Sequence, residues 1–302
     1  MRQREHEIDY KPEEIAARIP RKQAIWKESW RMFRSNTPAF VSMFVLLFIL
    51  GLIYIGQFIW PMEYAIRQVM QDRLQPPSSQ YWFGTDGLGR DVFVRVVHGG
   101  RLSIAVGLIP TLIAMGFGLF FGAAAAFYGK WVDNAIMRAV DTIQCIPFML
   151  LMMMIVAVLG PGINNAIIAL AITNIPGFIR SVRALIMDIV ERDYIEAAKA
   201  CGTSNVVTMY KHVLKNAIGP LVLIFVSSVS GMIMAGAMLS FLGLGAQPPY
   251  PEWGFMVAGA REFLLRAPHL LFIPAMAIVL TALSLNLVGD GLRDVLDPRL
   301  RR

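Results

Sequence analysis

A segment of small and polar side chains separates two long apolar stretches in the second half of the chain. It predicts a short helix that ends at a left-handed glycine, followed by a second helix with a Thr or Ser cap. Small side chains on the first helix would let the backbone of a partner approach closely. From the pattern alone, a docking surface and an ordinary hairpin packed beneath the helices are equally favoured. The residues concerned are Glu196, Ala197, Ala198, Gly202, Thr203, Ser204 and Asn205.

The side chains that usually carry catalysis do not gather into motifs in this sequence. The four histidines are scattered without metal-ligand spacing, and Cys145 and Cys201 lie in an apolar run and a polar loop. There is no Gly-x-x-x-x-Gly-Lys-Ser/Thr motif, so the sequence predicts no ATPase site in this chain. We therefore expect no catalytic residue, no metal ion and no cofactor bound by this polypeptide.

Composition predicts an all-α polytopic membrane protein with six transmembrane helices. The chain is 56% apolar and 16% charged, whereas soluble domains carry about 25% charged residues. A helix needs about 20 apolar residues to cross a bilayer. Asn174 and Pro176 are expected to interrupt the fourth span. The expected spans are 39–60, 103–127, 139–159, 166–179, 218–242 and 270–288.

Basic residues are distributed unevenly between the loops on the two sides of these spans. Of the 28 Lys and Arg residues, 21 fall in the N-terminal segment, the 128–138 and 180–217 loops and the C-terminal tail. The positive-inside rule therefore places both termini and the 180–217 loop in the cytoplasm. Because the net charge of +7 is explained by membrane orientation, no nucleic-acid partner is expected.

The residue pattern of the N-terminal arm predicts an amphipathic helix at the membrane surface. Trp26, Trp30 and Phe33 recur at helical spacing, with basic residues on the other faces. A simple anchor before the first span is favoured over a gating role.

Polar residues inside the expected spans are candidates for the interior of the bundle. Asp141 is expected at the inner membrane surface, paired with an arginine such as Arg138. The candidates for lining a pathway or bonding between helices are Asn174, Ser227, Ser228 and Ser230.

The loop after the first span contains three glycines and two acidic residues around one arginine. The glycines allow tight turns, Thr85 or Asp86 is suited to cap a following helix, and Arg90 and Asp91 to pair. No strand precedes the loop and no Gly-Lys-Ser/Thr follows it, so nucleotide binding is rejected. The motif residues are Gly84, Thr85, Asp86, Gly89, Arg90 and Asp91.

This motif resembles the Gly-Thr-Asp-x-x-Gly-Arg-Asp signature of the C-type permease subunits of dipeptide, oligopeptide and nickel ABC importers. The segments 242–249, 251–254 and 286–298, and the Glu-Ala-Ala loop itself, also resemble that family. The resemblance extends from about the first span to the end of the chain and excludes residues 1–25. One departure is Lys215, which stands where the family usually has proline.

The resemblance implies a type I ABC importer permease fold, in which this chain forms half of a translocation pathway. The implied partners are a second homologous permease, two cytoplasmic ATPases that bind ATP and Mg, and an extracytoplasmic binding protein at the 61–102 and 243–269 loops. Short peptides are favoured as cargo; nickel or another solute is the alternative, and an ion-coupled secondary carrier is less favoured because no acidic cluster lies at mid-depth.

This interpretation places the chain in a bacterial or archaeal cell membrane as a multi-pass protein. The expected organisation is a cytoplasmic arm (1–37), a first span with its outer loop (38–102), a core with five spans and coupling loop 180–217 (103–290), and a cytoplasmic tail (291–302).

Overall fold

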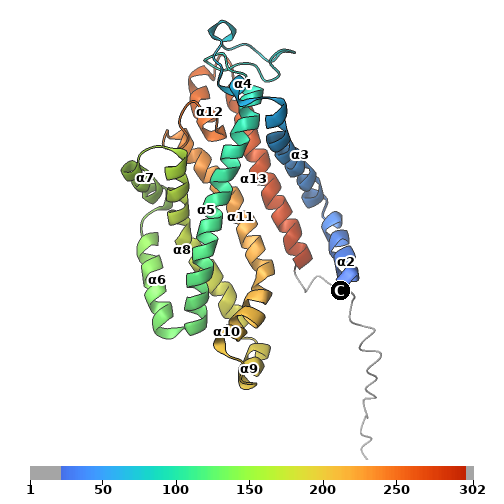
Figure 1. Cartoon of the computed structure of the whole chain (residues 1–302), viewed down its shortest axis with the longest axis vertical. Coiled ribbons are helices and arrows are strands. Elements are labelled where there is room, and N and C mark those ends of the chain that lie inside the picture. Colours follow the sequence, from blue (N-terminus) through green and yellow to red (C-terminus); the bar gives the residue numbers. More distant parts are fainter. Residues whose placement is uncertain (1–21, 297–302) are drawn as a thin grey trace, which may run out of the picture.

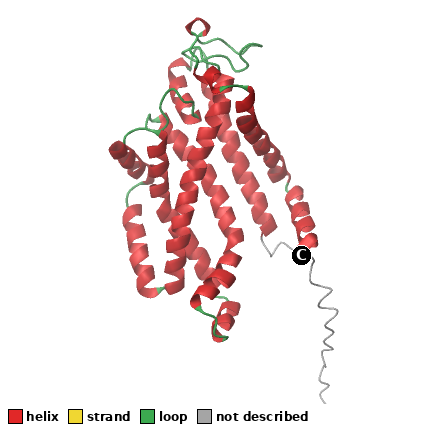
Figure 2. Ribbon diagram, in the orientation of Figure 1, coloured by secondary structure: helices red, strands yellow, loops and turns green. Residues whose placement is uncertain are grey.

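The computed structural model of the chain describes residues 22–296, and the expectations for 1–21 and 297–302 lie outside that part. Among the described residues the secondary structure is helical, without strands (Figure 2). Within residues 22–296, five helices are long and apolar enough to cross a membrane, and the fourth of them is continuous with the helical residues from Asn205 onwards. They are α3 (Thr37–Ile59), α5 (Val92–Tyr128), α8 (Ile163–Val190), α11 (Lys215–Phe241) and α13 (His269–Leu296).

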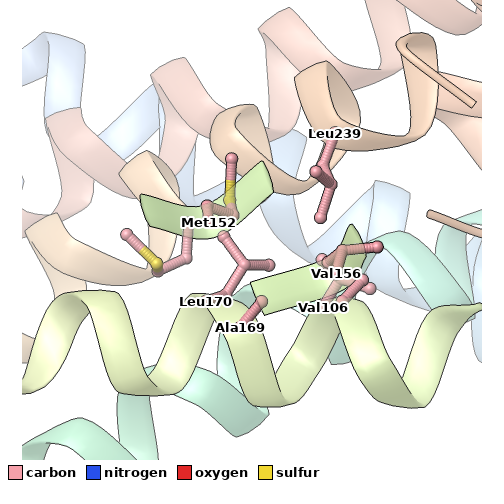
Figure 3. Packing of buried hydrophobic residues seen from close by; sticks show 8 residues of the cluster. Val106, Met152, Val156, Ala169, Leu170 and Leu239 are labelled. Atoms are coloured by element: carbon pink, nitrogen blue, oxygen red, sulfur yellow. The ribbon is translucent and has the colours of Figure 1, made fainter. Parts of the chain in front are cut away.

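The helix α5 is the centre of the bundle and packs against α8 and α11 (Figure 1). Its glycines allow α8 to come close, since a Cβ at Gly118 would lie 2.6 Å from Cβ of Phe178. In a bilayer, such small residues drive association because they increase van der Waals contact between helices. One buried cluster joins α5, α8, α11 and α7 (Phe148–Leu159), and Figure 3 shows Val106, Met152, Val156, Ala169, Leu170 and Leu239 in it.

The expected third span is not one continuous helix. The helix α6 (Lys130–Gln144) ends before a break, and α7 then leaves at a bend of 82°. Pro147 occupies the break with φ −53° and ψ 133°, outside the helical region. Because proline disfavours helical geometry at the preceding residue, the apolar run bends here. The two helices together count as a sixth crossing if they form one broken span.

The expected fourth span is longer than predicted and is not interrupted. Asn174 and Pro176 both lie inside α8, which continues as a helix to Val190. Pro176 is buried in the bundle, where neighbouring helices make a proline tolerable in a transmembrane helix.

The expected 180–217 loop is correspondingly shorter in the structure. Helix resumes at α10 (Asn205–Val207) and passes through a π-helical turn, η2 (Thr208–Leu214), into α11. The connection that remains is residues 191–204, which we call the hairpin, and it contains α9 (Asp193–Ala200). Lys215, in place of the family proline, lies within this unbroken helical run.

The predicted amphipathic helix is present as α2 (Lys22–Ser35) and packs against α3 and α13. Phe33 is buried with Ala39 and Val295, and Asn36 Nδ2 donates to Asp294 Oδ2 at 2.8 Å. Whether this helix lies at a membrane surface stays a prediction.

The short elements are divided between the two ends of the bundle (Figure 1). The helices α9 and α10 lie at one end, with the hairpin. At the opposite end lie α4 (Met62–Ile66), η1 (Met70–Asp72), α12 (Trp253–Ala260) and η3 (Arg261–Phe263).

Candidate functional site

The hairpin is attached to the bundle through one apolar side chain. Ile195 of α9 is fully buried, and the residues around it contact α8 and the helix that follows the hairpin. Burying a side chain of this size contributes about 1.5–3 kcal/mol. The buried cluster consists of Ala123, Val182, Ile186, Ile189, Ile195, Val213, Ala217 and Leu221.

The end of α9 has the glycine-dependent geometry that the sequence predicted. Gly202 has φ +79°, and its N–H donates to the Lys199 carbonyl at 3.0 Å. The N–H of Thr203 donates to the Ala198 carbonyl at 3.1 Å, which completes a Schellman motif. Ser204 caps the next helix by accepting from the N–H of Val207, so the predicted Ser cap is present.

The residues expected to dock on a partner lie mainly on the surface of the hairpin. Glu196, Ala197, Gly202, Ser204 and Asn205 are exposed. Ala198 and Thr203 are half-buried. The hairpin is therefore buried on its Ile195 side and open on its Glu-Ala-Ala side, which is a geometry suited to a contact. The contact itself stays a prediction.

One side-chain hydrogen bond joins the hairpin to the helix that follows it. Asn216 Nδ2 donates to the Tyr194 hydroxyl at 3.2 Å and to the His212 carbonyl at 2.6 Å. The second bond satisfies a carbonyl of the π-helical turn, where the regular ladder of helical bonds is disturbed. Thr208, at the start of that turn, is buried, and its hydroxyl has no hydrogen-bond partner among the described residues.

At the opposite end, the Gly-Thr-Asp motif folds into a compact loop. Thr85 is fully buried; its hydroxyl donates to the Asp72 carbonyl and accepts from the N–H of Gln75 at 2.9 Å. A Cβ at Gly89, which has φ +71°, would lie 1.8 Å from the Val69 carbonyl oxygen. Only glycine fits this position, because both the backbone conformation and the space exclude a side chain.

The ion pairing in this loop differs from the expectation. Arg90 pairs with Asp86, Nε to Oδ2 at 2.7 Å, and not with Asp91. Asp91 instead caps α5 by accepting from the N–H of Val94 at 3.2 Å, a role that the sequence had given to Thr85 or Asp86. Burial raises the pKa of the Asp91 carboxyl, an effect that outweighs the backbone N–H groups directed at it.

Two buried charged residues near this loop were missed by the sequence reasoning. Arg95, 2% exposed, donates to the Ala65 carbonyl at 2.8 Å and lies 3.5 Å from Asp86. Glu252, 1% exposed, caps α12 and accepts from the Ser103 hydroxyl at 2.8 Å. A charge in the first turn of an apolar helix was the available signal for Arg95. For Glu252 it was an acid directly before an apolar helical run.

The candidate pathway residues are not brought together into one site. Ser230 is buried and donates to Asn286 Oδ1 at 2.9 Å, so it bonds between α11 and α13. Ser227 is exposed, Ser228 is half-buried, and the amide nitrogen of Asn174 has no partner among the described residues.

Two ion pairs join α6 to α8, and the sequence predicted neither. Asp141 pairs with Arg180, Nη2 to Oδ1 at 2.6 Å, instead of with Arg138. Asp133 pairs with Arg183 through both carboxylate oxygens. These partners are 39 and 50 residues apart in the chain.

Metal and disulfide chemistry has no site in the described part of the chain. No three His, Cys, Asp or Glu side chains within residues 22–296 come together to hold a metal ion. Cys145 and Cys201 are both free thiols on the surface.

Most of the sequence that forms the bundle and the hairpin matches the model of a known protein family. The model of the binding-protein-dependent transport system inner membrane component matches residues 114–302. This chain belongs to that family. A second model, the N-terminal TM domain of oligopeptide transport permease C, matches residues 25–77. The chain is therefore a C-type permease subunit of an ABC importer, with the all-α type I permease fold.

Curated relatives resemble this permease over nearly their whole length. The dipeptide transport system permease protein DppC of Alkalihalophilus pseudofirmus is 39% identical over 91% of this chain and 90% of its own. The glutathione transport system permease protein GsiD of Pectobacterium atrosepticum is 41% identical over 91% of this chain and 92% of its own. GsiD of Escherichia coli is 42% identical over 91% of both.

A solved structure shares the fold of this permease. Inward-facing MetNI, a methionine ABC transporter, contains a chain that superposes with a TM-score of 0.55 at 20% identity. The match covers 67% of this permease and 96% of that chain. At this identity the likeness shows the fold alone.

Proposed function

We propose that this permease forms one half of the translocation pathway of an ATP-driven importer of short peptides. The choice of peptides as cargo is supported by similarity to permeases named for dipeptide and glutathione transport, which extends along more than nine-tenths of this chain. Both cargoes are short chains of amino acids with free charged ends. The spans also lack His-rich or Cys-rich lining that would favour a metal cargo.

The proposed complex contains a second, homologous permease, two ATPases and an extracytoplasmic binding protein. Its support is the exposed Glu-Ala-Ala side of the hairpin at one end and the rigid loop of Thr85 and Asp86 at the other. ATP and Mg would be bound by the ATPases. We propose that both termini and the hairpin lie in the cytoplasm, on the ATPase side, and the concentration of Lys and Arg in the loops on that side supports this orientation.

In this proposal the hairpin transmits motion from the ATPases to the bundle. Closure of two ATPases on ATP would displace the hairpin, which is held to α8 and α11 by Ile195 and Asn216. Because packed helices move as rigid bodies, the displacement would change the side from which the pathway is open.

Reconstitution of the whole complex tests the cargo. We expect proteoliposomes to accumulate labelled dipeptide or tripeptide when ATP is present on the ATPase side, with peptide-loaded binding protein stimulating ATP hydrolysis. Uptake of nickel without peptide, together with no peptide stimulation of the ATPase, would overturn the choice of cargo and leave a nickel importer.

Copurification tests the energy source. We expect an affinity tag on this permease to retain the two ATPases and the second permease. Peptide uptake by the isolated chain, driven by an ion gradient without ATP, would instead establish an ion-coupled carrier.

A further inference from the structure

The ion pair between Asp141 and Arg180 is unusually open for its position. The two side chains are 61% and 50% exposed, and both belong to helices that count towards membrane crossings. Charged side chains at membrane depth are costly unless they face a bundle interior or a water-filled cavity. We therefore infer that the surface of the bundle carrying this ion pair does not face lipid.

Counted along α6 and α8, Asp141 and Arg180 lie deeper in the bilayer than the sequence predicted, which set Asp141 at the inner membrane surface and Arg180 in a cytoplasmic loop. Tyr128 and Trp131, 63% and 80% exposed, lie at the turn from α5 to α6, where aromatic residues typically mark the membrane surface. Asp141 comes about 15 Å after Trp131, since a helix rises 1.5 Å per residue. Arg180 likewise lies about 15 Å from the end of α8 at Val190. These distances are half the thickness of the hydrocarbon core.

A second observation indicates the same face. Every residue from 141 to 148 is exposed, and this stretch contains the 82° break between α6 and α7. Peptide groups at a helix break lose their regular partners, and such a break is tolerated at membrane depth only inside protein or beside water. Because the ion pair and the break are adjacent, charged side chains and exposed peptide groups occur together at mid-depth, beside the apolar side chains of Ile143, Ile146 and Phe148.

The neighbouring ion pair has a different environment. Asp133 and Arg183 are only 21% and 24% exposed, lie nearer to the α5–α6 turn, and join the same two helices. That pair is suited to hold α6 against α8. The structure thus contains one enclosed pair and, less than three turns away along each helix, one open pair.

We propose that Asp141 and Arg180 bind the charged ends of a peptide as it passes between the two permeases. The guanidinium of Arg180 would take the terminal carboxylate in a bidentate contact, and Asp141 would take the terminal ammonium. A zwitterionic peptide replaces one ion pair with two, so neither side chain is left unpaired at membrane depth. This inference rests on the peptide-importer function proposed above.

The reactivity of the native Cys145 thiol can be used to measure whether this surface is open to water. It is exposed, lies one turn beyond Asp141, and becomes the only cysteine of the chain in a Cys201→Ser background. In the assembled complex we expect a water-soluble thiol reagent to modify Cys145, followed on this chain by mass spectrometry. A saturating dipeptide should slow the modification. Reaction with lipid-soluble maleimides alone, in both the nucleotide-free and ATP-trapped complex, would overturn the proposal.

Substitutions then test which end of the peptide each of the two charged side chains binds. Without binding protein, we expect Arg180→Gln to raise the dipeptide concentration that protects Cys145 at least tenfold and to remove the preference for a free carboxylate over its amide. Asp141→Asn should remove the preference for a free amino group over its acetylated form. Arg183→Gln, the control in the enclosed pair, should retain both preferences even if the complex becomes less stable.

The outcomes separate this inference from the function on which it rests. If the wild-type complex imports peptides but Arg180→Gln keeps wild-type protection and selectivity, the binding site is refuted and the importer remains. If the wild-type complex imports no peptide, the proposed function itself fails.

Discussion

The side chain of Asn216, at the start of α11, donates to the hydroxyl of Tyr194 on α9 at 3.2 Å. This bond connects the hairpin with the transmembrane helix that follows it, next to the buried Ile195. The same amide also donates to the His212 carbonyl. Asn216 is thereby placed to pass a movement of α9 to α11.

Replacing Asn216 with Leu should weaken coupling between ATP hydrolysis and transport. Both hydrogen bonds are lost, each worth about 0.5–1.5 kcal/mol, and we expect two- to tenfold less peptide imported per ATP hydrolysed. Parallel measurements of uptake and hydrolysis in proteoliposomes give this ratio. Tyr210→Phe, which removes the hydroxyl of another exposed tyrosine near this helix, is the control and should leave the ratio unchanged. An unchanged ratio in Asn216→Leu would refute the connection.

Gly202 should tolerate Asn far better than Ala. No atom lies within 4 Å of a Cβ built there, so the cost comes from the left-handed backbone, about 1–2 kcal/mol for most residues and less for Asn and Asp. We expect Gly202→Asn to retain uptake and Gly202→Ala to lower it. Gly202→Asp should uncouple transport with normal membrane insertion, because it adds a negative charge to the proposed docking surface. Equal uptake in all three variants would show that the Schellman geometry is dispensable.

Glu196→Lys should also uncouple transport while the protein inserts normally. Glu196 is exposed on α9, so the substitution leaves the bundle intact and reverses one charge on the proposed docking surface. Copurification of the ATPases and peptide uptake measure the effect. Wild-type uptake in this variant would argue against docking at this surface.

Gly89→Ala should disrupt the loop at the opposite end. The added Cβ would lie 1.8 Å from the Val69 carbonyl oxygen in a backbone that already has φ +71°. We expect lower yield of folded protein by size-exclusion chromatography and loss of stimulation by the binding protein. Gly51→Ala is the control, because nothing lies within 4 Å of its Cβ in the helix α3. Similar behaviour of the two variants would contradict the steric argument.

Glu252→Gln should destabilise the contact between α12 and α5. The carboxylate accepts from the N–H groups of Gly254 and Phe255 and from the Ser103 hydroxyl. The glutamine amide would put an N–H donor where one of these accepting oxygens now lies. We expect a loss of about 1–3 kcal/mol, measured by thermal unfolding in detergent. Ser103→Ala removes one of these bonds and should cost less. A Glu252→Gln protein as stable as wild type would show that the buried carboxylate is not needed.

The sequence predicted the helices whose apolar runs were long and uninterrupted. The spans realised as α3 and α11 have nearly the predicted limits, and the hairpin has its predicted glycine turn and Ser cap. These features depend on local patterns of hydrophobicity and capping, which sequence displays directly.

Pro147 and Pro176 show why the remainder was not predicted. Both occur in apolar runs, yet Pro147 lies at an 82° bend and Pro176 within a continuous helix. Which outcome occurs depends on the helices packed around each proline. The pairing of Asp141 with Arg180 likewise depends on how α6 and α8 are placed side by side, because no local pattern relates residues 39 positions apart.

The uninterrupted course of α8 has a mechanical consequence. From Arg180 to the start of the hairpin the helix is continuous, so a tilt of about 10° would displace one of these two ends by about 2.6 Å relative to the other, given the roughly 15 Å between them. That displacement is as large as the 2.6 Å separation of the Arg180 and Asp141 atoms. A small displacement of the hairpin end of α8 is thus enough to separate the two charges.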